Sequence, residues 1–519
     1  MHSLAALFST LLALTFVVVP LDDRPVTAQL PQLLGAIAGV RVAEPPRTML
    51  GRYLTPGDTG ALLRWLRRDA PPDARAFIVS DDMMVYGGLV ASRIPGVTRA
   101  EAYTRLSDLA AFRATRPNAS FAAFGTVMRL APTGVPRLGP AATFPFAGAD
   151  VWGAIQQYAN LPDPPQTAEQ QAVAASLRRK LGPTLDAYLD TRARDRDVDL
   201  FALRTTAEGG FDRIVIGQDD AGPVGLHLRD LAALRAFASD WVGPARASIE
   251  PGADELAMAL VSSALARAAH LVPRVQVIYS RADGAAVNDP LEFAPIATTI
   301  ADLTRTCGGR LVRAGENADI ALYVEVPDTS PADETAFADA IATNARDPHR
   351  TAAVAIADLT FLAVDDYAQQ RRLTDDLIAR DAAARVDAFA SWNTVANTVG
   401  TALPEAIAAL AGRALGTYDA RAHARFTLMR YVDDVAFHTA VRPQLNADLT
   451  AAGISDHTYL TPAVAMQTAA QNRTLLWPAG LDLLARIEPQ FRAAGFTLTL
   501  PWDRTFETEL DLRPAPGGT

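Results

Sequence analysis

Residues 14–26, LTFVVVPLDDRPV, join an apolar, largely β-branched run to Pro20 and then to Asp22, Asp23 and Arg24. A short run of this kind that ends in turn residues is typical of a buried strand. Charged residues beyond a strand can simply form a solvated turn or cap a helix. The same arrangement recurs further along this chain, however, and the recurrence guides the interpretation of the whole sequence.

Similar apolar runs alternate with amphipathic segments of helical periodicity, which is the pattern of parallel strands joined by crossover helices. The sequence predicts strands at 15–19, 40–43, 76–79, 121–128, 213–217, 275–279, 321–326, 352–357 and 386–391. The predicted fold class is therefore α/β, with parallel βα units in two lobes, of which the second is doubly wound. A decorated (β/α)8 barrel is the alternative, although nine strands exceed its eight.

A chain of 519 residues is too long for one ordinary domain core, so several structural units are expected. The predicted units are a signal or extension at 1–13, an N-terminal α/β lobe at 14–270, a doubly wound lobe at 271–415 and a mainly helical region at 416–519. Residues 1–13 are apolar like a signal peptide, but no Lys or Arg precedes them and Leu11 stands where a small residue is usual. We expect a cytoplasmic protein and leave export through residues 1–13 open.

Composition excludes several classes of function. The formal net charge is -10 and the basic residues are scattered, so no nucleic-acid partner is expected. No segment has about 18 uninterrupted apolar residues, so no integral membrane segment is expected. Cys307 is the only cysteine, which excludes an intramolecular disulfide and a thiolate metal cluster, and we expect it to pack in the core. The motifs of phosphate-binding loops, dinucleotide sites, zinc proteases and serine hydrolases are absent from the sequence.

Polar residues gather after the predicted strands, where the ligand sites of parallel α/β folds lie. Three strands end in aspartate pairs: Asp22 with Asp23, Asp81 with Asp82, and Asp219 with Asp220. Neighbouring strand ends lie only about 5 Å apart. Because carboxylates so close together repel, some must be protonated, paired with arginine or bound to a cation.

Other candidates for substrate binding accompany these pairs or follow other strands: Arg24, Tyr86, Arg129, Trp392, Asn393 and Asn397. In SWNTVANTVG the two asparagines are four residues apart, so a helix that begins near Thr394 would present both to one site, and Trp392 could stack on a sugar ring. The YGGL segment is typical of a turn that needs positive φ. Asp254 and Glu255 are expected to cap a helix. Residues 501–512, PWDRTFETELDL, look like a further strand.

Paired aspartates in different environments suit glycoside hydrolysis. We therefore expect a carbohydrate-active hydrolase, a glycosidase, that acts on a small-molecule or oligosaccharide substrate. Asp219 or Asp220 would be the general acid, and a carboxylate from residues 81 and 82 or 22 and 23 the nucleophile or base. A divalent-metal-dependent phosphoesterase or lyase and a non-catalytic sugar-binding protein are the alternatives. No cofactor is expected, except a divalent metal under the first alternative, and no residue is assigned as a metal ligand.

The motifs PLDDRPV, DDMMVYGGLVASR, GQDDAG, GADE and SWNTVANTVG together resemble those of a bacterial family catalogued as a domain of unknown function. The resemblance covers nearly the whole chain from about residue 14 and is consistent with residues 1–13 being an extension. Family members commonly carry glycine before the WNT motif, where Ser391 stands here. The resemblance implies no particular activity.

Overall fold

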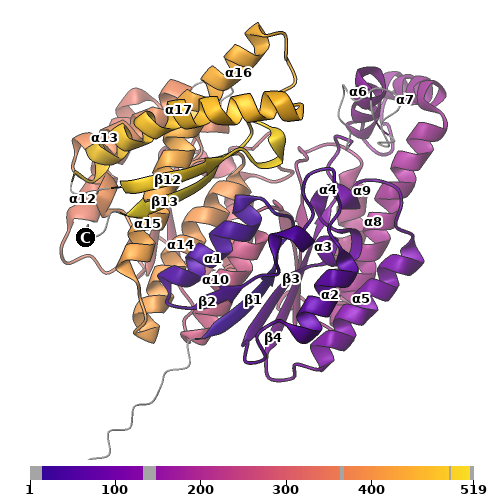
Figure 1. The fold of residues 1–519 in the computed structure, drawn as a ribbon, viewed down its shortest axis with the longest axis horizontal. Helices are drawn as coiled ribbons and strands as arrows, with labels where there is room; N and C mark the ends of the chain where they lie inside the picture. Colours follow the sequence, from indigo (N-terminus) through magenta and orange to yellow (C-terminus); the bar gives the residue numbers. More distant parts are fainter. Residues whose placement is uncertain (1–13, 133–145, 147, 363–366, 490–492, 515–519) are drawn as a thin grey trace, which may run out of the picture.

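The computed structural model describes residues 14–132, 146, 148–362, 367–489 and 493–514, and these form two parallel sheets and one hairpin (Figure 1). The first sheet has the strand order β2-β1-β3-β4-β5-β6. Its strands are β1 (Thr15–Val19), β2 (Arg41–Ala43), β3 (Ala76–Ser80), β4 (Ser120–Val127), β5 (Arg213–Gln218) and β6 (Ala247–Pro251). Every residue of β1 and β3 is buried, because helices cover both faces of the sheet.

The second sheet has the strand order β11-β10-β9-β7-β8. Its strands are β7 (Arg274–Tyr279), β8 (Arg310–Leu311), β9 (Ile320–Glu325), β10 (Ala353–Asp358) and β11 (Ala388–Ala390). In each sheet the strand that comes first in the chain lies between the second and the third, so the winding direction reverses there. Ligands of open α/β sheets bind beyond the carboxyl ends of the strands at such a reversal.

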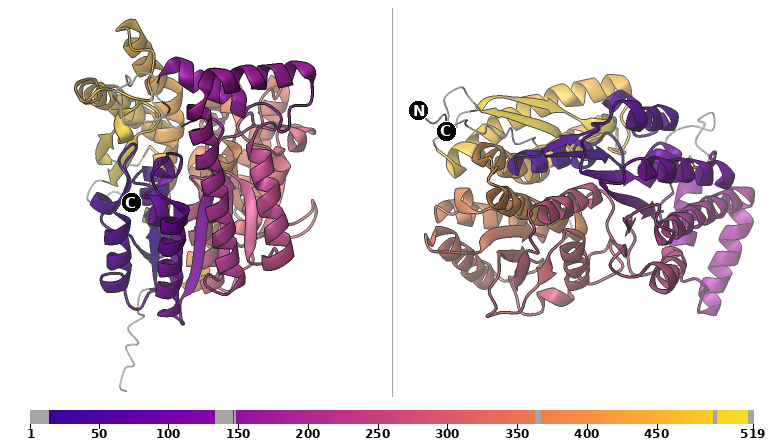
Figure 2. Two further views of the ribbon diagram at one scale, coloured as in Figure 1. Left: turned by 90° about the vertical axis from the view of Figure 1, so that its right-hand side faces the viewer. Right: turned by 90° about the horizontal axis from the view of Figure 1, so that it is seen from below.

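A layer of helices fills the space between the two sheets: α1 (Leu30–Ile37), α10 (Leu256–Ala268), α11 (Ile296–Thr306) and α14 (Val395–Leu415). Helix α10 packs on β3 and β4, α14 packs on β10 and β11, and the two helices pack against each other. Gly400 permits this approach, because a Cβ there would lie 2.3 Å from Cγ of Glu255. The two lobes therefore share one hydrophobic core, and Figure 2 gives two further views of the layers.

Other helices cover the outer faces of the sheets. The first sheet is covered by α2 (Thr59–Arg68), α3 (Asp81–Tyr86), α5 (Arg99–Ala114), α8 (Pro183–Ala207) and α9 (His227–Phe237). The second is covered by α12 (Pro331–Arg346), α13 (Tyr367–Ala379) and the π-helical segment η7 (Tyr431–Val441). Helices α6 (Ala149–Ala159) and α7 (Ala168–Leu181) pack with the start of α8 in a small core of their own and extend beyond the sheet (Figure 1).

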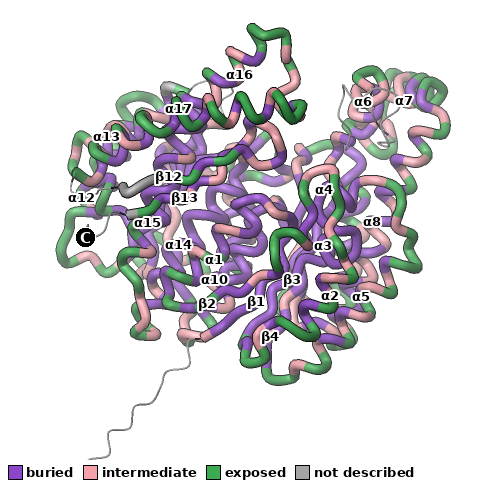
Figure 3. Tube along the Cα trace, in the orientation of Figure 1, coloured by how far each residue is buried: buried purple, intermediate pink, exposed green. Residues whose placement is uncertain are grey.

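The C-terminal region packs on the second lobe and reaches back to the first. It contains α15 (Ala420–Arg430), α16 (Arg442–Ala451), α17 (Pro462–Ile487) and an antiparallel hairpin of β12 (Ala493–Thr499) and β13 (Glu509–Pro514). Leu498 and Leu512 of the hairpin join the core under the second sheet. The turn of the hairpin carries Trp502 to the first lobe. Figure 3 shows buried residues along β1 and β3 of the first sheet, whereas α7 is largely exposed.

The structure confirms the predicted α/β class and all nine predicted strands, with small differences in their bounds. The barrel alternative is wrong, because both sheets are open. The sequence does not predict β6, β8 or β12; β6 is an edge strand with Glu250 and Pro251 at its end, which hides the apolar pattern. Cys307 is buried, as predicted.

In the described part of the chain, no helix has the length and apolar character to cross a membrane. The signal or extension predicted at 1–13 lies outside the described residues.

Candidate active site

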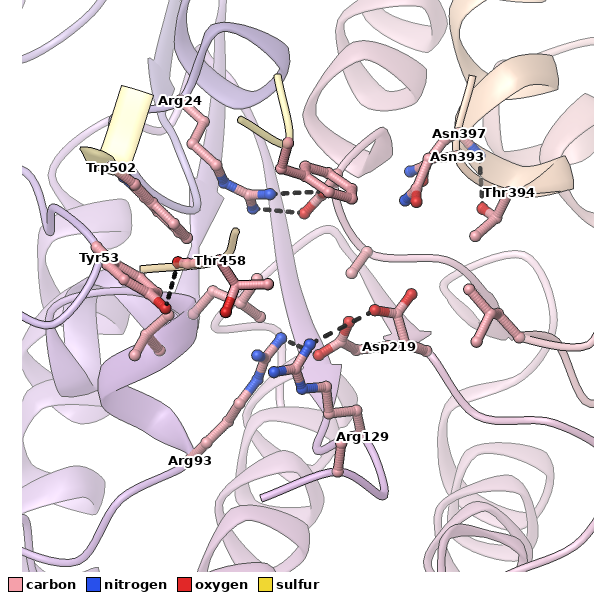
Figure 4. Close-up of a pocket in the computed structure, with 18 of the residues that line it drawn as sticks. Arg24, Tyr53, Arg93, Arg129, Asp219, Asn393, Thr394, Asn397, Thr458 and Trp502 are labelled. Atoms are coloured by element: carbon pink, nitrogen blue, oxygen red, sulfur yellow. Dashed lines mark hydrogen bonds and ion pairs between the residues drawn. The ribbon is translucent and has the colours of Figure 1, made fainter. Parts of the chain in front are cut away.

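A cavity of about 420 Å³ lies beyond the carboxyl ends of the first sheet, between that lobe, the start of α14 and the C-terminal region (Figure 4). Six of the residues predicted from the sequence line it: Arg24, Arg129, Asp219, Asp220, Asn393 and Asn397. The other six predicted residues are not part of its lining: Asp22, Asp23, Asp81, Asp82, Tyr86 and Trp392. The strand-end rule, that ligands bind beyond the carboxyl ends of the strands, therefore finds the cavity. It does not distinguish the side chains that face the cavity from those that lie behind its wall.

The PLDDRPV segment holds Arg24 between two carboxylates. The guanidinium donates to Asp22 from Nε at 2.9 Å and from Nη2 at 2.7 Å, and to Asp254 from Nη1 at 2.8 Å and from Nη2 at 2.6 Å. All three side chains are buried. Burial alone would lower the pKa of Arg24, but the two carboxylates raise it well above its usual value. Both edges of this guanidinium are thus occupied by protein.

Trp502 of the C-terminal region fixes the other side of this segment. Its indole N–H donates to Oδ1 of Asp23 at 2.6 Å, which accounts for the second aspartate of the pair. Its ring stacks on Tyr53 at a centroid distance of 5.2 Å, and the guanidinium carbon of Arg24 lies 4.5 Å from its centre. Trp502 therefore positions Arg24 and Asp23, and its ring is already in contact with Tyr53 and Arg24.

Backbone strain concentrates around the cavity. Tyr53, Asn393 and Trp502 have φ values of 46°, 58° and 60°, and all three line the cavity. They are three of the seven non-glycine residues with positive φ in the described part of the chain. Side chains other than glycine rarely adopt this conformation, and such strain gathers at functional sites.

The GQDDAG segment after β5 places Asp219 and Asp220 in unlike surroundings. Arg93, at the end of the short helix α4 (Leu89–Ser92), donates to Asp219, and both of these side chains are buried. Nη1 of Arg129 lies 3.6 Å from Oδ2 of Asp220. Burial and the charge of Asp219 raise the pKa of Asp220 to about 6, while Arg129 opposes the rise. Asp219 is thus paired with a cation, and Asp220 can carry a proton near neutral pH.

Asp81 and Asp82 begin α3 directly after β3 and lie in a buried acidic cluster with Asp195 and Asp199 of α8. Burial raises the pKa of all four carboxyl groups, that of Asp82 to about 7 and that of Asp195 to about 6. The hydroxyl of Thr126 donates to Asp82 at 2.8 Å. The cluster interacts electrostatically with Asp219 from behind the cavity.

Two glycines are required around α3, each for a different reason. A Cβ at Gly125 of β4 would lie 2.2 Å from Oδ1 of Asp81, so only glycine fits there. Gly87 ends α3 with a φ of 91°, which confirms the positive φ predicted for the YGGL segment. Tyr86 lies in the core beneath Arg194, whose guanidinium carbon is 4.5 Å from the ring centre, and so is not a cavity residue.

Replacement of Asp82 by asparagine should stabilise the protein more at pH 8 than at pH 5. The folded state keeps the Asp82 proton up to about pH 7, whereas the unfolded state loses it near its ordinary value. The free energy of unfolding therefore falls as pH rises through this window. Asparagine can accept the Thr126 hydrogen bond without titrating, so we expect a gain of about 1–3 kcal/mol at pH 8.

Urea denaturation at the two pH values measures this difference. Asp197→Asn, on the more exposed side of α8, is the matched control and should show no pH-dependent gain. An equal change of stability at pH 5 and pH 8 would contradict the expected titration of Asp82.

The SWNTVANTVG segment brings the second lobe to the cavity. Helix α14 begins directly after Thr394, as the sequence predicts, and Thr394 caps it, since its hydroxyl accepts from the backbone N–H of Asn397. Nδ2 of Asn393 donates to Oδ1 of Asn397 at 2.5 Å, and Nδ2 of Asn397 donates to Glu255 at 2.7 Å. Trp392 instead packs in the shared core and donates to Thr401 at 3.1 Å. It is not placed to stack on a ligand in the cavity.

Asp254 is a cavity residue that the sequence does not assign to the site. Asp254 and Glu255 directly precede α10, and Glu255 stands at its N-cap position, but no side chain makes a capping hydrogen bond there. Asp254 pairs with Arg24 instead and lines the cavity. Asp254 follows β6, so recognition of that strand would have identified it by the strand-end rule. Arg93 follows a turn within helical segments, and no comparable sequence signal points to it.

The residues that could hold a metal ion are few. In the described ranges, no group of three or more His, Cys, Asp or Glu side chains has an arrangement suited to a metal ion. The carboxylates of Asp22, Asp219 and Asp254 each accept hydrogen bonds from a guanidinium. The predicted absence of a cofactor stays a prediction.

The comparison with protein families decides what the chain is related to. A family model described as "Protein of unknown function (DUF4127)" matches residues 16–511. The chain belongs to the DUF4127 family. The match spans both lobes and the C-terminal region, so every part of the cavity comes from the family domain. No curated protein and no solved structure matches the chain significantly.

Proposed function

We propose that this DUF4127 protein is a carbohydrate-active hydrolase, a glycosidase, with Asp220 as its general acid. One observation carries the proposal: a single cavity contains an acid with a pKa of about 6 next to carboxylates that pair with arginines. Glycoside hydrolysis needs two carboxyl groups that differ in protonation at the same pH. Asp220 has a raised pKa, whereas Asp254 forms an ion pair with Arg24.

Each group has one role in the proposed reaction. Asp220 gives its proton to the glycosidic oxygen as the bond from that oxygen to the anomeric carbon breaks. The carboxylate of Asp254 serves as nucleophile or as base for the attacking water, and water supplies the hydroxyl group of the new reducing end. Asp254 takes this role in place of Asp22, Asp23, Asp81 and Asp82, because those four do not line the cavity.

The remaining lining is suited to a small polyhydroxylated ligand. Asn393 and Asn397 present amides, and Thr458 presents a hydroxyl, on different sides of the cavity (Figure 4). Cavities of about 300–1,000 Å³ hold small organic ligands, and this one falls at the lower end of that range. A short sugar therefore fits better than a long polymer.

A sugar-binding protein without catalysis is the second candidate. Two doubly wound sheets with the same relative strand order flank the cavity, and such a pair of lobes can simply enclose a ligand. The metal-dependent alternative has less support, because arginines already occupy the carboxylates of Asp219 and Asp254.

A panel of glycosides separates these functions. Purified protein is incubated with aryl and natural glycosides with and without EDTA, and released sugars are measured by chromatography. We expect release that EDTA does not change. Release that EDTA abolishes would favour the metal-dependent enzyme. Calorimetric binding of an intact sugar with no release would favour the binding protein and contradict the glycosidase.

A further inference from the structure

Arg129 differs from the other arginines of the cavity in how its guanidinium is partnered. Arg24 donates to two carboxylates, Arg93 donates to Asp219, and Arg504 donates to Glu507 at 2.5 Å. Arg129, by contrast, donates no hydrogen bond to any residue that the structure describes. Its Nε is buried without an acceptor, as are the Nε atoms of Arg93 and Arg504. Its ion-pair partner Asp220 lies 3.6 Å away, beyond ordinary hydrogen-bond distance.

The guanidinium of Arg129 faces the cavity, so a ligand there can accept its hydrogen bonds. Its side chain keeps 30% of its surface exposed although its Nε is buried. Figure 4 shows the guanidinium groups of Arg93 and Arg129 side by side on one side of the cavity, with Arg24 on the opposite side. Two neighbouring cations in a partly buried site repel each other unless anions balance them.

Catalysis would disturb this balance. Asp219 and Asp220 together match the charges of Arg93 and Arg129 while both acids are ionised. In the proposed reaction Asp220 must carry a proton, and Arg129 then has no anionic partner among the described residues. An anion on the substrate would restore the balance, and its charge would also favour the protonated form of Asp220.

We infer that the substrate is an acidic sugar whose anionic group is bound by Arg129 with Arg93 beside it. This inference rests on the proposed glycosidase function and narrows its substrate class. The shared chemistry is an oxyanion: a carboxylate, as in a uronic acid, or a phosphate or sulfate ester. The planar fork of a guanidinium binds such groups through two parallel hydrogen bonds.

Calorimetry with matched sugars tests the inference independently of turnover. Each neutral hexose of the panel is paired with its uronic acid and its 6-phosphate. We expect the wild type to bind at least one acidic sugar about tenfold or more tightly than its neutral counterpart. Preference between uronic acid and phosphate identifies the source of the anion. Equal binding of neutral and acidic sugars, or binding of none, would overturn the inference.

Variants assign the effect to Arg129. Arg129→Met should weaken binding of the acidic sugar about 10–100-fold and that of the neutral sugar less than about twofold, with Arg129→Lys in between. The matched control is Arg229→Met, which removes a surface arginine 3.0 Å from Asp163 and should change neither. Equal weakening of both sugars by Arg129→Met would count against an anion site. If Arg129→Met does not fold, the wild-type preference and Arg129→Lys still decide.

Asp220→Asn adds a test of the competition for Arg129. Because this change removes the carboxylate beside Arg129, the variant should bind the acidic sugar more tightly than the wild type does. Equal or weaker binding would overturn the inferred competition. Hydrolysis of neutral glycosides without any preference for acidic ones would contradict this inference alone. Tight binding of an acidic sugar without hydrolysis would contradict only the proposed glycosidase function.

Discussion

Replacement of Asp220 by asparagine should lower kcat for glycosides with poor leaving groups by about 10²–10⁴-fold, the usual contribution of a general acid. Asparagine has nearly the same size but cannot give up a proton. Asp220 makes an ion pair with Arg129 rather than a close hydrogen bond, so its replacement should leave the fold intact. Steady-state kinetics together with thermal unfolding would separate lost chemistry from lost structure.

The pH dependence of the wild type gives the same prediction a second readout. The protonated form of Asp220 is the active one, and its pKa is about 6, so activity should fall as pH rises above that value. Asp186→Asn, which changes an exposed acid of α8, should keep this fall of activity above about pH 6. If Asp220→Asn retained both the wild-type kcat and the fall of activity at high pH, another residue would be the general acid.

Replacement of Arg24 by methionine should destabilise the fold by about 3–5 kcal/mol, the range for breaking a buried ion pair from one side. The change leaves the carboxylates of Asp22 and Asp254 buried without a cation and removes the group that lies on Trp502. Urea denaturation at pH 7 measures the loss.

Two further variants show whether the unpaired carboxylates of Asp22 and Asp254 cause that loss of stability. Arg47→Met removes an exposed arginine that pairs with Glu509 at 2.5 Å and should cost less than about 1 kcal/mol. Adding Asp22→Asn and Asp254→Asn to Arg24→Met should recover part of the stability, because no buried carboxylate is then left unpaired. A loss from Arg24→Met as small as that from Arg47→Met would contradict the ion-pair account.

Local sequence patterns predict much of this fold because strands here are short apolar runs with turn residues behind them. The same rule locates Asp22, Asp219 and Asp220 at one end of a sheet, since the carboxyl ends of parallel strands share an edge. It cannot tell which of two adjacent aspartates faces a cavity. That depends on the start of the next helix, as the burial of Asp81 and Asp82 in α3 shows.

The sequence does not predict the contacts between distant segments, for a different reason. The second carboxylate partner of Arg24 is Asp254, which is 230 positions away and follows an edge strand with polar residues. Trp502 reaches Asp23 only because the C-terminal hairpin folds over both lobes. Neither contact follows from spacing or periodicity, because both depend on how whole elements pack.

The dependence of the Asp220→Asn defect on the leaving group tests the central claim most directly. A 2,4-dinitrophenyl glycoside needs no proton on its departing oxygen, whereas a methyl glycoside of the same sugar does. The account predicts that Asp220→Asn loses most of its kcat/KM on the methyl glycoside and retains most of it on the dinitrophenyl glycoside. Equal loss on both substrates, or no loss on either, would contradict the assignment of Asp220 as the general acid.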